Sequence, residues 1–350
     1  MAPVPAEYLP IRLENLRNSM RAKGLDAVLI NHPANRHYIG GVYANDTQIG
    51  ESAGWLLIGL TKAYGLFSSA HFDEWKSQAT HLENICLEPP SGRKYPVRAA
   101  EIINANQWKR IGVDEDALGM RWHDETMAGL GGLAKLLPMG GLIEELRNEK
   151  DEWELSCVRE ACAITSKAYE YVMSYVKPGI TEKELAWELE KAMRENGADD
   201  IGFDTIVGAG EFAAVPHHVP IDRKIAEGES VVVDMGAMVN GYGADMTRTF
   251  CFGKAPERLV QMHSDIEKAL DREVSYAVVG AKPNGHGVGL SIHENLRIRE
   301  GATLRPNMTL AIEPAVYVPG WGGVRLEDTV LVTADGQERL TTATMQLEFV

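Results

Sequence analysis

The sequence has a deficit of positive charge and few cysteines. Its 350 residues include 35 lysines and arginines against 50 aspartates and glutamates, which gives a formal net charge of −15. Nucleic acids and anionic membranes repel such a protein, so we expect neither as a partner. The four cysteines, at positions 86, 157, 162 and 251, show no Cys-x-x-Cys spacing. We expect them to be reduced, buried thiols.

Long apolar runs are also missing. The run at residues 55–60 is far too short to cross a bilayer, and residues 1–5 do not begin a charged-then-apolar signal peptide. We therefore expect a cytoplasmic protein. Hydrophobic residues make up 45% of the chain, enough to bury a large core and to form about two domains.

The first part of the chain alternates between helical and strand patterns, which is typical of an α/β domain. Apolar residues on one helical face predict a helix over residues 11–23, and a short buried strand follows at residues 26–30. Further strands are expected at residues 54–60, 63–68, 84–87 and 110–113. A Gly-rich turn at residues 138–141 places the domain boundary after Met139, so the predicted domains are 1–139 and 140–350.

The second part begins with two helices. The first covers about residues 152–176, with an apolar stripe, and ends at Pro178-Gly179. Thr181 and Glu184 form a capping box that opens the second helix, which runs to residues 196–197. The class predicted for the whole chain is α/β (α+β).

Two stretches of the second part are imperfect copies of each other. Residues 231–234 lead to residues 239–243, and residues 310–313 lead with the same spacing to residues 318–322. Each copy contributes two acids, and two histidines precede the second pair. These residues are Asp234 and Asp245, Glu313 and Glu327, and His286 and His293. Two matched carboxylate pairs with histidine are what a two-metal hydrolytic site needs.

The placement of the acids strengthens this interpretation. Residues 231–233 and 310–312 are continuous apolar runs, so they predict central strands that carry Asp234 and Glu313 into a cleft. A single acid after a strand is usually a cap or a solvated turn residue. Carboxylates that converge, however, cannot all stay ionised without a counter-charge, and divalent cations supply one. An imidazole among the ligands favours Mn²⁺, Co²⁺ or Zn²⁺ over Ca²⁺ or Mg²⁺.

The second copy is shorter than the first. Pro178 precedes His217 by 39 positions, whereas Pro283, at the end of a helix expected over residues 256–279, precedes His293 by only 10. This predicts that the second half, shortened after Pro283, lacks one helix and one strand. Such a loss would leave an unpaired strand edge and exposed apolar surface near the site.

Several motifs together resemble the creatinase/prolidase/aminopeptidase P family. They are Asp234-Met235-Gly236, residues 244–249, residues 285–290, Ile292-His293-Glu294, Ile312-Glu313-Pro314 and residues 325–328. Residues 24–27 and 33–38 are similar to that family's first domain. The resemblance covers almost the whole chain. It implies an N-terminal creatinase-like α/β domain followed by a pseudo-two-fold pita-bread catalytic domain.

The resemblance also implies a metallopeptidase site. Its ligands would be Asp234, Asp245, His286, Glu313 and Glu327, which would hold two Mn²⁺, Co²⁺ or Zn²⁺ ions. By this resemblance Asp245 and Glu327 bridge both ions, Asp234 binds one, and His286 and Glu313 bind the other. Creatinase-like members lack this set, so its completeness favours a peptidase.

The resemblance implies further roles around the metals. Glu313 would take a proton from water, and His217 and His293 would bind substrate and stabilise charge on the carbonyl. His218, the next residue after His217, could be a solvated or hydrogen-bonded histidine without a role in the reaction. Arg325 could orient Glu327, anchor a substrate carboxylate, or form a structural ion pair. The implied substrate is a small peptide with proline at the second position, and the implied assembly is a homodimer.

Three positions depart from the family pattern. Lys282 replaces a second histidine that normally precedes the metal histidine by four residues, Leu296 replaces proline, and Ala315 replaces glycine. Three interpretations therefore remain open. The preferred one is an active Xaa-Pro dipeptidase or aminopeptidase. The others are a catalytically impaired, metal-binding family member and a hydrolase of a non-peptide C–N bond.

Overall fold

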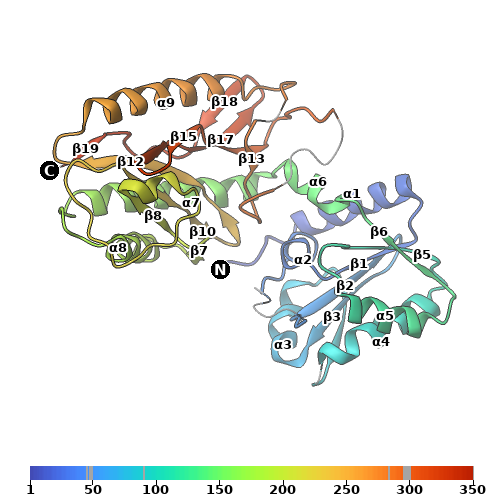
Figure 1. The fold of residues 1–350 in the computed structure, drawn as a ribbon. Coiled ribbons are helices and arrows are strands. Elements are labelled where there is room, and N and C mark those ends of the chain that lie inside the picture. Colours follow the sequence, from blue (N-terminus) through green and yellow to red (C-terminus); the bar gives the residue numbers. More distant parts are fainter. Residues whose placement is uncertain (45, 47–49, 90, 283, 295–300, 350) are drawn as a thin grey trace. The chain divides into compact units, whose positions relative to one another are not determined.

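The computed structural model describes residues 1–44, 46, 50–89, 91–282, 284–294 and 301–349, and Figure 1 shows their fold. The chain divides into two compact units, residues 2–147 and residues 148–350, the latter including Met1. Pro283 and Leu296, which the sequence analysis singled out, lie outside the described residues.

The first unit is built on a six-stranded sheet of order β4-β3-β2-β1-β5-β6. Strand β1 runs antiparallel to β2 and parallel to β5. The strands are β1 (Ala27–Ile30), β2 (Gly54–Gly59), β3 (Ala63–Ser68), β4 (Glu83–Leu87), β5 (Arg110–Val113) and β6 (Lys135–Pro138). The helices are α1 (Tyr8–Lys23), α2 (Pro33–Gly40), α3 (Ser69–Gln78), α4 (Ser91–Ala105), α5 (Met120–Leu130) and α6 (Leu142–Asn148). The helix and strands predicted from the sequence in this unit are confirmed.

The units divide after Arg147, whereas the domain boundary predicted from the sequence follows Met139. Helix α6 accounts for the difference, because its side chains bond to α2 of the first unit. Arg147 donates to Asn35 at 2.8 Å, and Asn35 donates to Glu144 at 2.6 Å. The boundary after Met139 stays a prediction.

The second unit contains the predicted repeat. Its helices are α7 (Glu152–Met173), α8 (Glu182–Glu195) and α9 (Glu257–Ser275), with a 3₁₀ turn η1 (Gly210–Ala214). The strands of its first half are β7 (Asp200–Ile201), β8 (Ile206–Ala209), β9 (Val231–Met235), β10 (Ala237–Val239), β11 (Tyr242–Gly243) and β12 (Met246–Phe252). The remaining strands are β13 (His286–Gly287), β14 (Thr309–Ile312), β15 (Ala315–Val318), β16 (Gly322–Arg325), β17 (Asp328–Thr333), β18 (Gly336–Arg339) and β19 (Glu348–Phe349). In Figure 1 these strands lie between α9 on one side and α7 with α8 on the other.

Helices α7 and α8 both begin with a capping box. The capping box at α8 is confirmed: the Glu184 amide donates to the Thr181 hydroxyl, and the Thr181 amide donates to the Glu184 carboxylate. Helix α7 begins with a second capping box, formed by Asp151 and Glu154. The predicted apolar stripe of α7 is buried in the core of the unit, and the helix packs against β10 and β11.

The two halves have matching topology. Strands β9 and β14 are the central strands that the sequence predicts, in four-stranded sheets of order β19-β12-β9-β8 and β13-β14-β17-β18. Each is followed by a short hairpin, β10-β11 in the first half and β15-β16 in the second, before an antiparallel partner returns. The expected pseudo-two-fold arrangement is confirmed.

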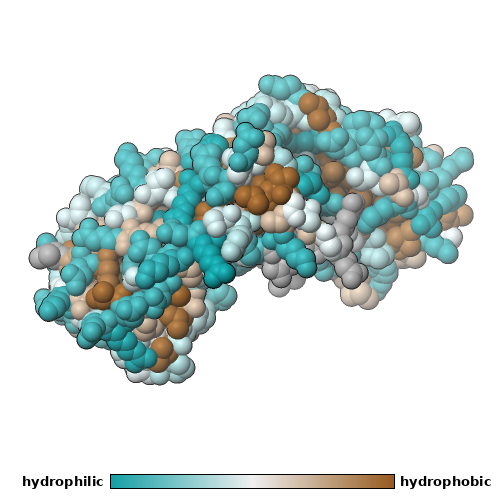
Figure 2. All heavy atoms as spheres, turned by 90° about the horizontal axis from the view of Figure 1, so that it is seen from above, coloured by the Kyte–Doolittle hydropathy of each residue, from teal (hydrophilic) through white to brown (hydrophobic). Residues whose placement is uncertain are grey.

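The shortening of the second half is also confirmed for the described residues. There α9 corresponds to α7, but nothing corresponds to α8. Strand β7 adds a third strand to the hairpin of the first half, whereas β15 and β16 form a two-stranded sheet. Helix α9 ends at Ser275, before the expected end at Val279, and the exposed apolar residues Tyr276, Val278 and Val279 follow. Figure 2, which looks down on the side of α9, shows hydrophobic residues as separate patches in a mainly hydrophilic surface.

The expectation of an unpaired strand edge is wrong at Gly287. This residue of β13 pairs with β14 on one side and forms a bridge with Glu294 on the other. The Gly287 amide donates to the Glu294 carbonyl at 2.9 Å, and the Glu294 amide donates to the Gly287 carbonyl at 2.8 Å. The chain therefore folds back and covers the edge itself.

Three of the four cysteines are buried and free, as expected: Cys157, Cys162 and Cys251. The expectation is wrong for Cys86, which is exposed. It lies on β4, an edge strand whose middle residues are covered only in part. Among the described helices, none has both the length and the apolar character needed to cross a membrane.

Candidate metal centre

The structure brings together all five residues that the sequence analysis put forward as metal ligands. Asp234 lies on β9 and Asp245 directly precedes β12, whereas Glu313 follows β14 and Glu327 directly precedes β17. Because β9 and β12 are antiparallel neighbours, as are β14 and β17, each pair of acids meets at one end of its sheet. His286 comes from the edge strand β13, which pairs with β14.

The distances between these side chains are those of a metal site. His286 Nε2 lies 3.6 Å from Asp245 Oδ2, 3.5 Å from Glu313 Oε1 and 4.0 Å from Glu327 Oε1. Three groups of residues have ligand atoms within 4.8 Å of one another: Asp234, Asp245 and Glu327; His286, Glu313 and Glu327; and Asp245, His286 and His293. Asp245, His286 and Glu327 each belong to two groups, so the three groups form one continuous cluster.

The electrostatics of the centre favour cation binding. Asp234, Asp245 and Glu327 are buried, and burial is the largest cause that raises the pKa of each carboxyl. Neighbouring carboxylates raise the pKa further, whereas the Arg325 guanidinium lowers it. One guanidinium cannot neutralise four carboxylates, so the centre needs additional positive charge to keep them ionised.

The donor atoms fit divalent cations. Asp234 Oδ2 accepts a hydrogen bond from Arg325, but Asp234 Oδ1 is buried and has no hydrogen-bond partner among the described residues. A buried carboxylate oxygen without a partner is costly, and a metal ion would satisfy it. Oxygen donors with one imidazole match the preferences of Mn²⁺, Co²⁺ and Zn²⁺.

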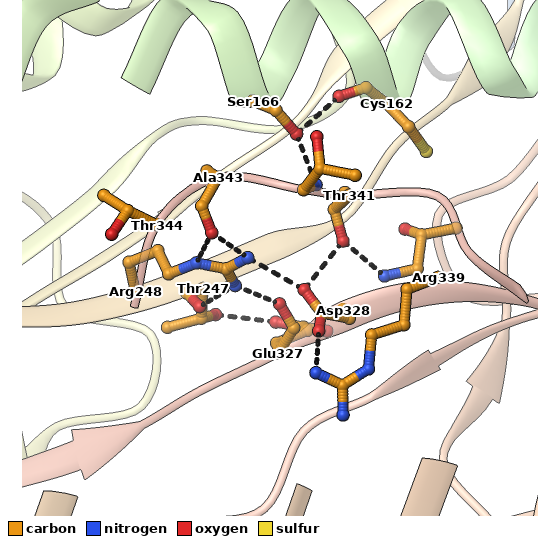
Figure 3. A network of polar contacts seen from close by, with 12 residues as sticks. Cys162, Ser166, Thr247, Arg248, Glu327, Asp328, Arg339, Thr341, Ala343 and Thr344 are labelled. Carbon is orange, nitrogen blue, oxygen red and sulfur yellow. Dashed lines mark hydrogen bonds and ion pairs between the residues drawn. The ribbon is translucent and has the colours of Figure 1, made fainter. Parts of the chain in front are cut away.

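A polar network behind the ligands fixes the two halves to each other. The Thr247 hydroxyl donates to Glu327 Oε2 at 2.6 Å, and the Glu327 amide donates to the Thr247 carbonyl at 3.0 Å. Next to this contact, Arg248 forms a buried ion pair with Asp328 at 2.9 Å and donates to the carbonyl of Ala343 (Figure 3). These contacts hold β12 and β17 in register, and so hold Asp245 beside Glu327.

The Arg325 guanidinium forms hydrogen bonds with three side chains and one backbone carbonyl. Besides Asp234, it contacts Thr247 Oγ1 at 3.0 Å, the Pro216 carbonyl at 3.1 Å and the Tyr317 hydroxyl at 2.8 Å. It therefore holds Asp234 directly and Glu327 through Thr247. The sequence analysis missed Thr247 and Tyr317. Thr247 follows Asp245 by two residues, the spacing that places two side chains on the same face of an extended segment, so this signal was available.

A cavity of about 330 Å³ opens onto the ligands. His217, His293 and Glu313 line it and are exposed, so they are accessible to a substrate. The rest of its wall is mostly apolar and is formed by Phe203, Ile206, Val219, Pro220 and Ile292, with the polar residues Asp204, His218 and Arg325 beside them. This combination of apolar surface and a few polar groups is typical of a site for a small molecule.

The two histidines outside the set of five ligands, His217 and His293, are called the outer histidines below, and they differ in their surroundings. The His293 ring lies against that of His286, with ring centroids 4.4 Å apart. Partial burial lowers the pKa of His293, and the neighbouring His286 lowers it further, which favours the neutral imidazole. His217 lies on a loop after η1. His218, which the sequence left open as a bystander, contacts Glu182 at 2.8 Å.

The residues that depart from the family pattern leave the ligands in place. Lys282 is exposed, and Ala315 is the exposed first residue of β15. The short second half still supplies His286, because β13 keeps its register with β14 through His286 and Gly287.

Comparisons with known proteins match both units. A model of the creatinase/prolidase N-terminal domain matches residues 12–148, and a model of metallopeptidase family M24 matches residues 156–284 and 258–334. The second unit has two mirrored halves that bring carboxylates and an imidazole together, and it follows a creatinase-type N-terminal domain in the chain. This combination defines a pita-bread metallopeptidase. The chain belongs to metallopeptidase family M24.

Similar proteins include peptidases with and without a defined substrate. An uncharacterized peptidase of Bacillus subtilis is 29% identical, over 96% of this chain and 99% of its own. A Xaa-Pro dipeptidase of Pyrococcus furiosus is 36% identical, over 59% of this chain and 66% of its own. The solved structure of a Xaa-Pro dipeptidase from Bacillus anthracis has a TM-score of 0.88 and 28% identity, and covers 98% of this chain and 100% of its own.

Proposed function

We propose that this protein is a metal-dependent Xaa-Pro peptidase, which hydrolyses the peptide bond preceding proline in a small peptide. One observation carries the proposal: the five ligand side chains converge beside an accessible cavity although the second half is shortened. The preference for proline is inferred from the similar proteins named Xaa-Pro dipeptidase.

In this proposal, two divalent cations would be held by Asp234, Asp245, His286, Glu313 and Glu327. When bound, two such cations polarise the scissile carbonyl and activate the attacking water, so that no serine or cysteine nucleophile is required. Asp245 and Glu327 would be shared between the two ions, because each has ligand atoms near other members of the set in two of the three groups.

The remaining steps are assigned to exposed side chains of the cavity. Glu313, at 39% side-chain exposure, takes the proton of the attacking water and passes it to the leaving amine. The imidazoles of His217 and His293 donate hydrogen bonds to the substrate carbonyl, and these bonds strengthen as negative charge develops. The apolar wall around Phe203 and Ile292 excludes water from the peptide.

A substrate panel tests this function. The protein, supplied with Mn²⁺ or Co²⁺, should cleave Leu-Pro or Leu-Pro-Ala at least about a hundredfold faster than the matched peptides Leu-Ala and Leu-Ala-Ala. Comparison of the two proline peptides decides between a dipeptidase and an aminopeptidase. Metal binding without turnover would instead support the impaired family member, and turnover restricted to amidines or ureas would support the hydrolase of a non-peptide C–N bond.

A further inference from the structure

The residue after each outer histidine contacts a buried side chain that can carry a charge. His217 is followed by His218, whose Nε2 lies 2.8 Å from the carboxylate of Glu182. His293 is followed by Glu294, whose carboxylate lies 2.9 Å from Lys150 Nζ. The side chains of Glu182 and Lys150 are 0% and 1% exposed. The two loops thus have the same kind of attachment, although they lie in different halves of the unit.

Glu182 holds the first loop at several points. It lies in the first turn of α8, and its carboxylate accepts hydrogen bonds from the amides of Ala209, at 2.9 Å, and Ile221, at 3.1 Å, as well as contacting His218. The His218 ring also stacks on Phe212, with centroids 4.8 Å apart. One carboxylate therefore joins the end of β8 to the segment that directly follows His217.

Lys150 connects the loop that carries His293 to the rest of the unit. Its amide donates to the Asn307 carbonyl, and its ammonium donates to the Asn148 carbonyl and to Glu294. Glu294 in turn makes two backbone hydrogen bonds to Gly287, the residue after His286. The ion pair therefore lies at the base of the segment that carries both His286 and His293.

Packing alone does not require these polar pairs. Burying charged groups costs solvation energy, and well-packed apolar side chains of similar size often stabilise a fold equally well or better. Exposed imidazoles on loops, in contrast, lose their effect on a reaction when they shift by about 1 Å. A charged, hydrogen-bonded anchor fixes both the distance and the direction of the backbone next to each imidazole.

We propose that Glu182 and Lys150 are positioning residues, each of which holds one outer histidine through the residue that follows it. The proposal rests on the proposed function, because it assigns the two histidines to one reaction. Neither positioning residue lines the cavity, and neither belongs to the five proposed metal ligands.

A double-mutant cycle tests the proposal by activity. Glu182→Gln should lower kcat at least about tenfold, with KM and metal content close to those of the wild type. In the His217→Ala background the same substitution should cost little more, whereas in the His293→Ala background it should cost its full amount. Lys150→Arg, which keeps the charge but changes its geometry, should show the reverse dependence. Losses that multiply equally in both backgrounds would overturn the proposal.

A second measurement needs no turnover, so it separates this proposal from the proposed function. Hydrogen exchange of the metal-loaded protein should be at least about tenfold faster at residues 215–221 in Glu182→Gln and at residues 286–294 in Lys150→Arg, with α7 unchanged. Asp222→Asn is the matched control, because Asp222 pairs with Lys183 beside the same loop but is exposed. Unchanged exchange in the anchored loops would overturn the proposal, whether or not the protein cleaves Xaa-Pro peptides.

Discussion

The Arg325 guanidinium lies 2.5 Å from the Asp234 carboxylate, and both side chains are at most 11% exposed. This contact occupies one oxygen of Asp234 and leaves the other without a partner among the described residues. Arg325 also lowers the pKa of Asp234, against the opposing effect of burial. The guanidinium therefore helps to keep Asp234 ionised and directed toward the metal centre.

Replacement of Arg325 should weaken metal binding. In Arg325→Gln, Asp234 loses the charge that keeps it ionised, so the affinity for Mn²⁺ should fall by about 10- to 100-fold, as measured by calorimetry. Arg325→Lys should recover only part of this affinity, because one ammonium cannot contact all three side chains and the backbone carbonyl that the guanidinium contacts. An unchanged metal affinity with a raised KM would instead mean that Arg325 binds the substrate carboxylate.

Substitution of Asp245 or Glu327 should differ from substitution of His293 in its effect on the metal content of the protein. Asp245→Asn and Glu327→Gln should lose metal and activity together, because each carboxylate is assigned to both ions. His293→Ala should keep its metal and lose about 10²- to 10³-fold in kcat, because only a hydrogen bond to the developing charge is removed. Elemental analysis of the purified variants, with steady-state kinetics, makes the comparison. Equal metal loss in all three variants would contradict the assigned roles.

Gly285, directly before His286, is held to a conformation that an L side chain does not fit. Its φ is +79°, and a Cβ there would lie 2.0 Å from the Ala311 carbonyl oxygen. Gly285→Ala should lower the free energy of unfolding by about 3 kcal/mol or more and should weaken metal binding. Gly280→Ala is the control: φ is +85°, but nothing lies within 4 Å of the added methyl group, so we expect a loss of about 1 kcal/mol. Urea unfolding of both variants tests this, and equal losses would count against the close approach at Ala311.

The first unit should show a pH dependence from Asp114. Burial, followed by the nearby Glu144, raises the pKa of Asp114 from 3.8 to about 7. The folded protein therefore binds this proton more tightly than the unfolded chain does, so stability falls as the pH rises from about 4 to about 7. Relative to Asp114→Asn, the wild type should lose up to about 1.4 kcal/mol per pH unit in this window. The control Asp116→Asn replaces an exposed acid and keeps Asp114, so its stability should depend on pH as that of the wild type does. Parallel curves for the wild type and both variants would refute the effect.

The sequence predicted the parts of the fold that depend on local pattern. The apolar runs before Asp234 and Glu313 are central strands, and the Thr181 capping box begins α8, because burial and capping leave a signal within a few residues. The shortened repeat was also visible, because the missing segment changes the spacing between matched prolines and histidines. The short capping box at Asp151, of the same kind, was overlooked.

The remaining features depend on residues far apart in the chain. Lys150 and Glu294 are separated by 144 positions, and Arg248 and Asp328 by 80. No periodicity links such partners, because the pairs form only when the two halves pack together. For the same reason the sequence could not show that the Glu294 backbone covers the edge of β13, or that Arg325 faces Asp234.

Anomalous diffraction from crystals soaked in Mn²⁺ tests the central claim most directly, namely that the five carboxylate and imidazole ligands form one two-metal centre. We expect two anomalous peaks about 3.5–4 Å apart, both in contact with Asp245 and Glu327. The absence of peaks at saturating Mn²⁺, or peaks away from these two side chains, would contradict the account.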